Sequence, residues 1–374
     1  MAYLGESIPK LGFGYMRLPR KAEGGYDMKM ICDMVDYFMD NGFTYFDTAY
    51  VYDGGDSEKA IYESLVSRYP RERFQLATKL KLPMAGIETA DDVGMELEKS
   101  LARTGAGYFD FYLLHALSGA GIEEYERLGA WDFVKRMKEE GKIRHYGFSF
   151  HDTADKLEAL LQKHPDAEFV QLQINYADWE DADVQARKNY EVCRKYGKPV
   201  VIMEPVKGGN LVTFKDEIKD MLRAHNPDAS IASWALRFCA SLDGLITVLS
   251  GMSSFEQLKD NVDMMKNFKP LCEEEYALLK KVREKLAETD TIPCTACRYC
   301  TEVCPMNIDI PRIFQVANGY KMYDNIVGSK RTYGFIPAER RAASCIECGA
   351  CEGTCPQHLP IRTLLKDADK NFGA

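Results

Sequence analysis

Eight of the twelve cysteines gather near the C-terminus in two copies of one spacing, Cys-x2-Cys-x2-Cys-x3-Cys-Pro. The two copies are Cys294, Cys297, Cys300, Cys304 and Cys345, Cys348, Cys351, Cys355. Thiolates at this spacing are typical ligands of a cubane iron–sulfur cluster, and in two-cluster proteins the fourth cysteine of each run ligates the other cluster. We therefore expect two [4Fe–4S] clusters, whose chemistry is the transfer of single electrons. The expected ligand sets are Cys294, Cys297, Cys300, Cys355 and Cys345, Cys348, Cys351, Cys304.

Other interpretations of these cysteines are weaker. Disulfides need an oxidising compartment, which nothing in the sequence indicates. Zinc sites favour two close pairs of ligands over a triplet and a fourth cysteine before proline. The four remaining cysteines lie singly in helical-looking stretches, and we interpret them as small buried hydrophobic residues. They are Cys32, Cys193, Cys239 and Cys272.

A second set of reactive side chains lies upstream, at the ends of apolar, strand-like runs. Its members are Asp47, Lys79, His115 and Ser149, with Tyr52 five residues after Asp47. A tyrosine beside a lysine and a histidine can act as a general acid, because an ammonium group lowers the pKa of a nearby phenol. Taken singly, each residue is more often a capping or hydrogen-bonding group, so the hypothesis depends on the whole set.

The elements that carry these residues alternate between strand and helix. The expected strands are 11–15, 44–49, 74–79, 109–115, 145–150, 169–175, 199–204 and 246–250. The expected helices are 27–41, 57–68, 90–103, 130–140, 153–163, 184–196, 229–240 and 254–265. Eight such pairs predict an α/β fold of the (β/α)8 TIM-barrel type, with its active site at the carboxyl ends of the strands. An open doubly wound sheet is less favoured because no G-x-G-x-x-G follows the first strand.

The length of 374 residues is enough for two domains. We expect the barrel over residues 1–270, a helix and linker over 271–293, and an α-helical two-cluster ferredoxin-like domain over 294–374. The net charge of −9 disfavours nucleic-acid binding. We see no apolar signal peptide and no run long enough to span a membrane. We therefore expect a cytoplasmic protein from a reducing, oxygen-poor cell.

Three short segments resemble the catalytic region of the aldo-keto reductase family: FDTAYVY at 46–52, ATK at 77–79 and LLH at 113–115. The resemblance covers roughly residues 1–265. It implies that Tyr52 donates a proton to a substrate carbonyl and that Lys79 depresses the pKa of Tyr52. It further implies that Asp47 pairs with Lys79 and that His115 orients the carbonyl.

The same resemblance implies a hydride donor, NAD(P)(H), lying across the barrel mouth. The residues that would contact it are Ser149, Gln171, Met203, Glu204, Pro205, Val206, Gly208, Gly251, Ser253, Gln257 and Asn261. The chain departs from the family pattern at Met203, where an aromatic ring often stacks on the nicotinamide, and at Phe150, where an asparagine is common. The basic residues that usually hold the 2′-phosphate of NADP are missing, so a preference for NADP is not expected.

The C-terminal region is similar to the helical two-cluster ferredoxin modules attached to anaerobic oxidoreductases, with expected helices at 311–323 and 360–370. The combined chain resembles the ferredoxin-tailed aldo-keto reductases of anaerobic bacteria and archaea. The expected partners are a small carbonyl or alcohol substrate and a redox protein such as ferredoxin. Lys330, Arg331, Arg340 and Arg341 form either a solvated surface or a dock for an acidic partner.

Three hypotheses for the whole chain stay open at this point. The protein is a nicotinamide-dependent carbonyl reductase whose clusters exchange electrons with a partner, or a ferredoxin-fed reductase that uses no nicotinamide. In the third, it is an ordinary reductase with a structural or docking tail. Hydride carries two electrons and a cubane cluster passes one, so joining them needs a converter such as FMN. The segments 204–210 and 250–257 could hold the phosphate of FMN.

Overall fold

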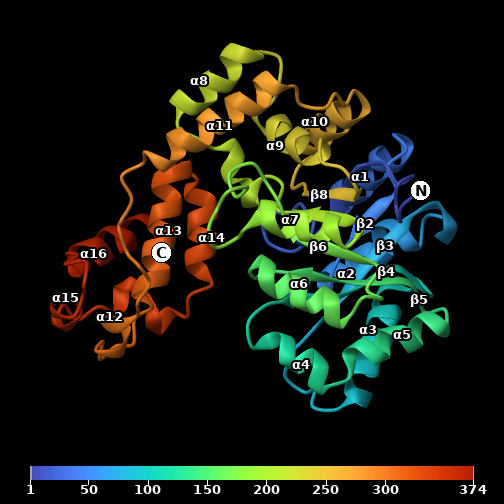
Figure 1. Ribbon diagram of the computed structural model, residues 1–374, viewed down its shortest axis with the longest axis horizontal. Helices are drawn as coiled ribbons and strands as arrows, with labels where there is room; N and C mark the ends of the chain where they lie inside the picture. Colours follow the sequence, from blue (N-terminus) through green and yellow to red (C-terminus); the bar gives the residue numbers. More distant parts are fainter. Residues whose placement is uncertain (1, 374) are drawn as a thin grey trace. The chain divides into compact units, whose positions relative to one another are not determined.

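The computed structural model describes residues 2–373, and eight parallel strands in its first part close into a barrel with helices outside (Figure 1). The strands are β1 (Leu11–Gly14), β2 (Tyr45–Asp47), β3 (Gln75–Lys81), β4 (Phe109–Leu117), β5 (Ile143–Phe150), β6 (Phe169–Gln173), β7 (Val200–Met203) and β8 (Leu245–Gly251). Each strand pairs with the next, and β8 pairs with β1. The predicted TIM barrel is confirmed, and the open sheet is excluded because the described sheet is closed.

The helices between the strands begin close to where the sequence predicts them. They are α1 (Met28–Asp40), α2 (Asp56–Ile61), α3 (Ala90–Thr104), α4 (Gly121–Arg127), α5 (Ala130–Glu139), α6 (Ala154–Lys163), α7 (Ala186–Lys195), α8 (Asp216–His225), α9 (Ile231–Ala240) and α10 (Phe255–Lys266). Thr89 and Asp92 form a reciprocal capping box at the start of α3, and Ser254 caps α10. The sequence did not predict α4 and α8, which precede α5 and α9.

The strand register explains why polar groups gather at one end of the barrel. Alternate residues of a barrel strand point inward. Tyr45, Ala77, Leu113, Phe169 and Val201 belong to one buried apolar cluster inside the barrel. Two residues further along the same strands come Asp47, Lys79, His115, Gln171 and Met203. These side chains therefore share the inward face, one layer closer to the carboxyl ends.

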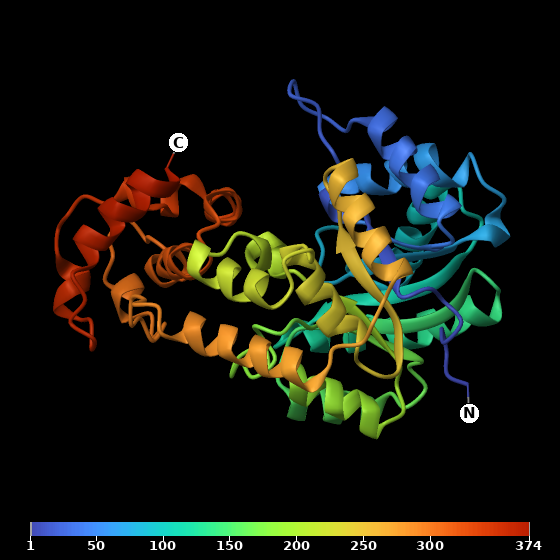
Figure 2. The same cartoon turned by 90° about the horizontal axis from the view of Figure 1, so that it is seen from above.

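The described chain divides into two compact units. The first contains residues up to Pro205 together with Ala232–Cys272, and the second contains Val206–Ile231 and the chain from Glu273 onward. In the second unit, α8 lies beside α11 (Glu273–Ala287), as Figures 1 and 2 show. An ion pair of 2.8 Å between Glu217 and Lys285 joins these two helices.

The rest of the second unit is helical, as the sequence predicts. Its helices are α12 (Tyr299–Glu302), α13 (Ile310–Tyr323), α14 (Ile326–Gly334), α15 (Ala350–Gly353) and α16 (Ile361–Phe372). The sequence predicted α13 and α16 but not α14 or the short helices α12 and α15. Helices α13, α14 and α16 pack around a small core that includes Ile313, Phe314, Tyr333, Leu365 and Phe372. No helix within residues 2–373 has both the length and the apolar character needed to cross a membrane.

Candidate functional site

A buried ion pair lies at the carboxyl end of the barrel. The ammonium of Lys79 donates to Oδ1 of Asp47 at 2.6 Å and to the carbonyl oxygen of Thr48 at 2.7 Å. The exposed fractions of the two side chains are 0% for Lys79 and 4% for Asp47. Burial alone would lower the pKa of Lys79, but the adjacent Asp47 carboxylate and the hydroxyl of Tyr52 outweigh burial and raise it. The ammonium of Lys79 therefore stays charged inside the barrel mouth, with the Asp47 carboxylate as its counter-ion.

Tyr52 lies beside this charge, at the start of a short 3-10 turn that follows β2. The Nζ atom of Lys79 is 5.0 Å from the centre of the Tyr52 ring. The rings of Tyr52 and His115 meet edge to face, with centres 5.8 Å apart. Burial raises the pKa of Tyr52, while Lys79 acts to lower it as expected but does not reverse the rise. The phenol therefore stays protonated at neutral pH, as a proton donor must.

His115 is held at an irregular point of β4. The pairing of β4 with β5 shifts register between Leu114 and Leu117, and Ala116 has a left-handed φ of 56°. Burial and the charges of Lys79 and Lys81 lower the pKa of His115 far below its ordinary value. The imidazole is therefore neutral, and its buried Nδ1 has no hydrogen-bond partner within residues 2–373. A neutral imidazole can orient a carbonyl by donating one hydrogen bond.

The residues expected to contact the nicotinamide carboxamide occupy neighbouring strands. Ser149 pairs with Gln171 between β5 and β6. The Ser149 hydroxyl accepts from the Ala116 amide at 2.7 Å. The Gln171 amide donates to Sδ of Met203 at 3.3 Å, and its buried carbonyl oxygen has no partner in the described chain. A buried acceptor of this kind fits a ligand with amide hydrogens, such as a carboxamide.

Glu204 and Pro205 follow β7 directly. Glu204 has a left-handed φ of 59°, and its carbonyl oxygen accepts from the side-chain amide of Asn175 at 3.2 Å. Its charge also acts to raise the pKa of Tyr52, so the Glu204 carboxylate lies within electrostatic reach of the phenol. Met203, Glu204 and Pro205 thus stay with the barrel, whereas Val206 and Gly208 belong to the second unit.

The segment after β8 is arranged by its own side chains. The carbonyl group of Gln257 accepts from the Ser253 amide at 2.8 Å, and Asn261 donates to Ser250 at 3.0 Å. The Ser253 hydroxyl donates to the carbonyl oxygen of Arg17 at 2.8 Å. A Cβ atom placed on Gly251 would lie 3.3 Å from Cβ of Arg17, so an arginine side chain borders this segment.

Arg17 is a candidate cation that the sequence analysis missed. It lies in the turn Tyr15–Arg17 that follows β1, far from β8 in the sequence. The pairing of β1 with β8 closes the barrel and brings the two segments together. In the sequence, Arg17 is visible only as a basic residue close after the first strand. That position indicates a site beside β8 only when the barrel is assumed to close.

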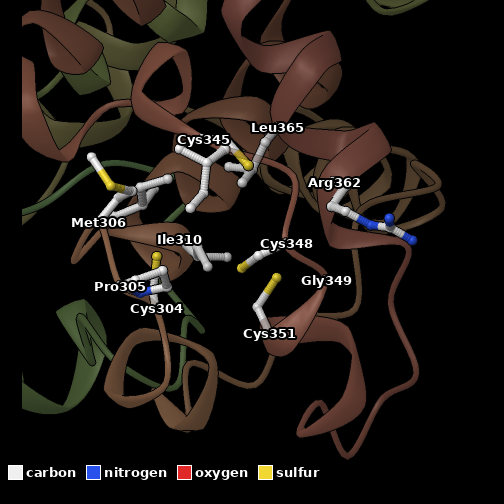
Figure 3. Close-up of a pocket in the computed structure, with 12 residues that line it drawn as sticks. Cys304, Pro305, Met306, Ile310, Cys345, Cys348, Gly349, Cys351, Arg362 and Leu365 are labelled. Atoms are coloured by element: carbon white, nitrogen blue, oxygen red, sulfur yellow. The ribbon is translucent and has the colours of Figure 1, made fainter.

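The eight clustered cysteines line two separate cavities in the second unit. Cys294, Cys297, Cys300 and Cys355 line one, and Cys304, Cys345, Cys348 and Cys351 line the other (Figure 3). These are the two sets that crossed ligation requires. Within residues 2–373, no three His, Cys, Asp or Glu side chains converge as ligands of one metal ion would. Ile310 borders both cavities, and their walls combine apolar residues with Arg362 in one cavity and Arg298 in the other.

Comparison with known families identifies both parts of the chain. Residues 10–284 match the aldo/keto reductase family. The chain belongs to this family. Residues 293–359 match the 4Fe-4S dicluster domain, so the C-terminal region is an iron–sulfur domain of the ferredoxin type. The predicted family and the predicted tail are both confirmed, and the protein is an oxidoreductase of the aldo-keto reductase type.

Individual relatives are distant. Probable aldo-keto reductase 1 of Glycine max is 27% identical over 231 residues, which are 59% of this chain and only 64% of that relative. The NADH-specific methylglyoxal reductase of Escherichia coli K12 is 26% identical over 286 residues, covering 64% of this chain and 83% of that relative. A crystal structure of an aldo-keto reductase from Klebsiella pneumoniae in complex with NADPH is similar with a TM-score of 0.60. It covers 75% of this chain and 93% of that one at 23% identity, which shows the fold alone.

The dicluster domain of this aldo-keto reductase repeats its backbone after 51 residues. Left-handed φ angles recur at the paired positions Ala296 and Glu347, Arg298 and Gly349, and Asn307 and His358. Each pair differs by 51 in number, as do the matching cysteines. The two cysteine runs therefore have the same local backbone conformation. Burial raises the pKa of Cys300 and raises that of Cys351 to about 11, and bound iron would favour the thiolate form there.

Two of the basic residues considered as a docking patch have structural partners. Arg341 donates to the carbonyl oxygens of Ile336 and Gly334, both at 2.7 Å. Arg340 donates to the carbonyl oxygen of Asn307 at 3.0 Å. These guanidinium groups bind the backbone of their own domain, which favours a structural role over docking.

The chain after β7 is also bound within the second unit. The Thr213 hydroxyl donates to the carbonyl oxygen of Tyr323 at 2.9 Å, and Asn325 donates to the side-chain oxygen of Asn210 at 2.7 Å. Asn325 is buried, and its own oxygen caps α14 by accepting from Gly328 at 2.9 Å. The segment that carries Val206 and Gly208 is therefore fixed by the junction between α13 and α14.

Proposed function

We propose that the protein interconverts a small carbonyl compound and its alcohol at Asp47, Tyr52, Lys79 and His115, and that two [4Fe–4S] clusters exchange electrons with a redox partner such as ferredoxin. The observation that carries the proposal is the buried Lys79–Asp47 pair beneath a protonated tyrosine. A buried lysine charge is costly, and Nζ of Lys79 lies 5.0 Å from the centre of the Tyr52 ring, where it can stabilise the charge that develops during proton transfer.

The roles of the four side chains follow from their protonation states. Tyr52 donates its phenolic proton to the carbonyl oxygen, and the negative charge left on its oxygen is stabilised by Lys79. The neutral His115 donates a hydrogen bond to the same oxygen. A bound nicotinamide would add the hydride, which completes the alcohol without any further electron donor. In the reverse direction Tyr52 takes the hydroxyl proton.

NAD(P)(H) is the donor that the barrel mouth fits best. Gln171 offers a buried carbonyl oxygen to the carboxamide, and the segment of Gly251, Ser253 and Gln257 borders Arg17. The choice between NADH and NADPH depends on whether Arg17 contacts a 2′-phosphate. One relative is named for NADH and a similar structure holds NADPH, so both need to be tested.

The eight thiols fit two cubane clusters, because each cavity offers four sulfurs from two separate runs and a largely apolar wall. When bound, such clusters pass single electrons, whereas a hydride carries two. FMN therefore stays a prediction as the converter between hydride and cluster. All twelve cysteines are unbridged in the described chain, and we place the protein in a reducing cytoplasm.

The proposal is tested with protein purified without oxygen and shown to contain iron and sulfide. Oxidation of NADH and NADPH is followed separately with methylglyoxal and with aromatic aldehydes. We expect aldehyde-dependent oxidation of at least one nucleotide. A protein with full clusters that reduces no aldehyde with either nucleotide, nor with reduced ferredoxin, would contradict the proposal.

A further inference from the structure

We infer that the substrate carries an anionic group, a carboxylate or a phosphate, and that Lys81 binds it. The inference rests on the proposed function and adds the substrate class to it. It concerns a residue to which neither the sequence analysis nor the family resemblance gave any role.

The position of Lys81 follows from the register of the barrel. Lys81 ends β3, two residues after Lys79, so the two side chains leave the strand on the same, inward face. Its partner on the neighbouring strand is His115. Adjacent strands lie about 4.8 Å apart. Lys81 is therefore one layer above the buried ion pair and directly beside the imidazole that would orient the carbonyl.

The backbone at Lys81 is fixed from both sides by one buried hydroxyl. Tyr125, from α4, accepts a hydrogen bond from the Leu82 amide at 2.8 Å and donates to the carbonyl oxygen of His115 at 2.6 Å. Its ring is fully buried. This clamp ties the end of β3 to the end of β4, so the stem of Lys81 starts from a rigid point next to His115.

The ammonium group of Lys81 has no partner to neutralise it. Within residues 2–373 it makes no hydrogen bond and no ion pair, although the residue is only partly exposed. The neighbouring His115 and His151 are kept neutral in part by the charge of Lys81 itself. Since Asp47 already compensates Lys79, Lys81 leaves an unbalanced positive charge at the mouth.

The partly buried ammonium of Lys81 has no counter-ion beside the reacting carbonyl, which is electrostatically unfavourable until an anion binds next to it. The positive charge of Lys81 would repel a cationic substrate and give a neutral substrate no added affinity. A carboxylate or phosphate attached close to the carbonyl could reach Lys81 while the carbonyl oxygen meets Tyr52 and His115. A charge-assisted hydrogen bond of this kind is among the stronger ones in proteins.

The test compares related substrates with and without the anionic group, using the full-length protein with its clusters. Phenylglyoxylate is compared with its methyl ester, and glyceraldehyde 3-phosphate with glyceraldehyde. In Lys81→Met we expect the preference for the charged member, as a ratio of kcat/KM values, to fall about 10- to 100-fold. Lys81→Arg should restore much of it, and the exposed Lys21→Met serves as a charge-matched control. The substrate pair whose preference falls in Lys81→Met shows whether the anionic group is a carboxylate or a phosphate.

A binding arm keeps this result apart from the proposed function. Benzoate, inorganic phosphate and neutral benzamide are titrated against wild type and Lys81→Met by calorimetry, with no turnover required. We expect one of the anions to bind wild type and to lose about 10-fold or more in affinity in the variant. If Lys81→Met changes charged and neutral ligands equally, the inference is wrong even where carbonyl reduction stands. If wild type reduces no carbonyl but anion binding depends on Lys81, the proposed function fails and the anion site stands.

Discussion

The barrel mouth and the dicluster domain position their reactive groups by opposite means. In the barrel, Asp47, Lys79 and His115 come from three different strands, and sheet register places them above an apolar cluster. In the dicluster domain, the thiols come from two short runs that share left-handed φ angles at positions 51 residues apart, and they line two cavities. The barrel site takes its residues from separate strands, whereas each cysteine site takes three thiols from one run and the fourth from the other run.

The two sites also differ in what stabilises them. The barrel site is held by protein groups alone, through the Lys79–Asp47 pair and the strands beneath it. The cysteine sites surround two cavities with sulfur and a few apolar residues, so bound clusters would supply the missing links between the two runs. We therefore expect the folding of this domain to depend on its metal more than that of the barrel does.

The largest expected effect follows from removing iron. Chelation should unfold the dicluster domain and leave the barrel folded. The two units can be followed separately, because Trp131, Trp179 and Trp234 all belong to the barrel unit. We expect amide hydrogen exchange to lose protection in α13 and α16 and tryptophan fluorescence to show an unchanged unfolding transition. If amide protection in the dicluster domain and the tryptophan transition of the barrel are lost together, the two units do not differ in their dependence on iron.

The next effect concerns Tyr52, the proposed proton donor. Tyr52→Phe should lower carbonyl reduction by roughly 10²- to 10⁴-fold, because the transferred proton is lost while the buried ion pair remains. Cluster absorbance and iron content should not change. Tyr50→Phe is the matched control, since the Tyr50 ring stacks on Arg103 at 4.2 Å instead of facing Lys79. Full activity of Tyr52→Phe would remove Tyr52 from the role of acid.

A smaller and more specific effect tests crossed ligation. The variant Cys300→Ala with Cys355→Ala should lose one cluster's iron, because both thiols line one cavity. The variant Cys300→Ala with Cys304→Ala should lose the iron of both clusters, because these thiols line different cavities. Iron and sulfide analysis distinguishes the two. The opposite pattern would mean that each run of four binds its own cluster.

The smallest effect is a pH dependence of barrel stability. The pKa of His115 is depressed in the folded state, so below about pH 6.5 the unfolded chain takes up a proton that the folded chain does not. The free energy of unfolding should therefore fall as pH decreases from 6.5, by about 1 kcal/mol per pH unit at this one group. His115→Asn should lack this part of the dependence. Denaturant unfolding, followed by tryptophan fluorescence at pH 7.5 and 5.5, measures the free energy of unfolding of both proteins. An equal change between the two pH values in wild type and variant would contradict the buried, neutral state of His115.

The sequence predicted the parts of this comparison that depend on local pattern. The eight strands were visible as apolar runs, the polar strand ends pointed to one face, and the cysteine spacing divided the thiols into two sets. It could not show that residues 206–231 join the second unit, because that depends on contacts such as Asn325 with Asn210. Arg17 was missed for the same reason. The raised pKa of Tyr52 depends on burial, which no spacing reveals.

The most direct test of the account is whether the two regions share electrons. Oxidised protein, free of oxygen and analysed for flavin, is mixed with NADH and with NADPH in separate experiments while absorbance and electron paramagnetic resonance are recorded. The account predicts that one nucleotide reduces the clusters, with FMN or another converter present in the protein. Clusters that stay oxidised with both nucleotides, but are reduced by dithionite or ferredoxin, would show that barrel and clusters do not form one redox path.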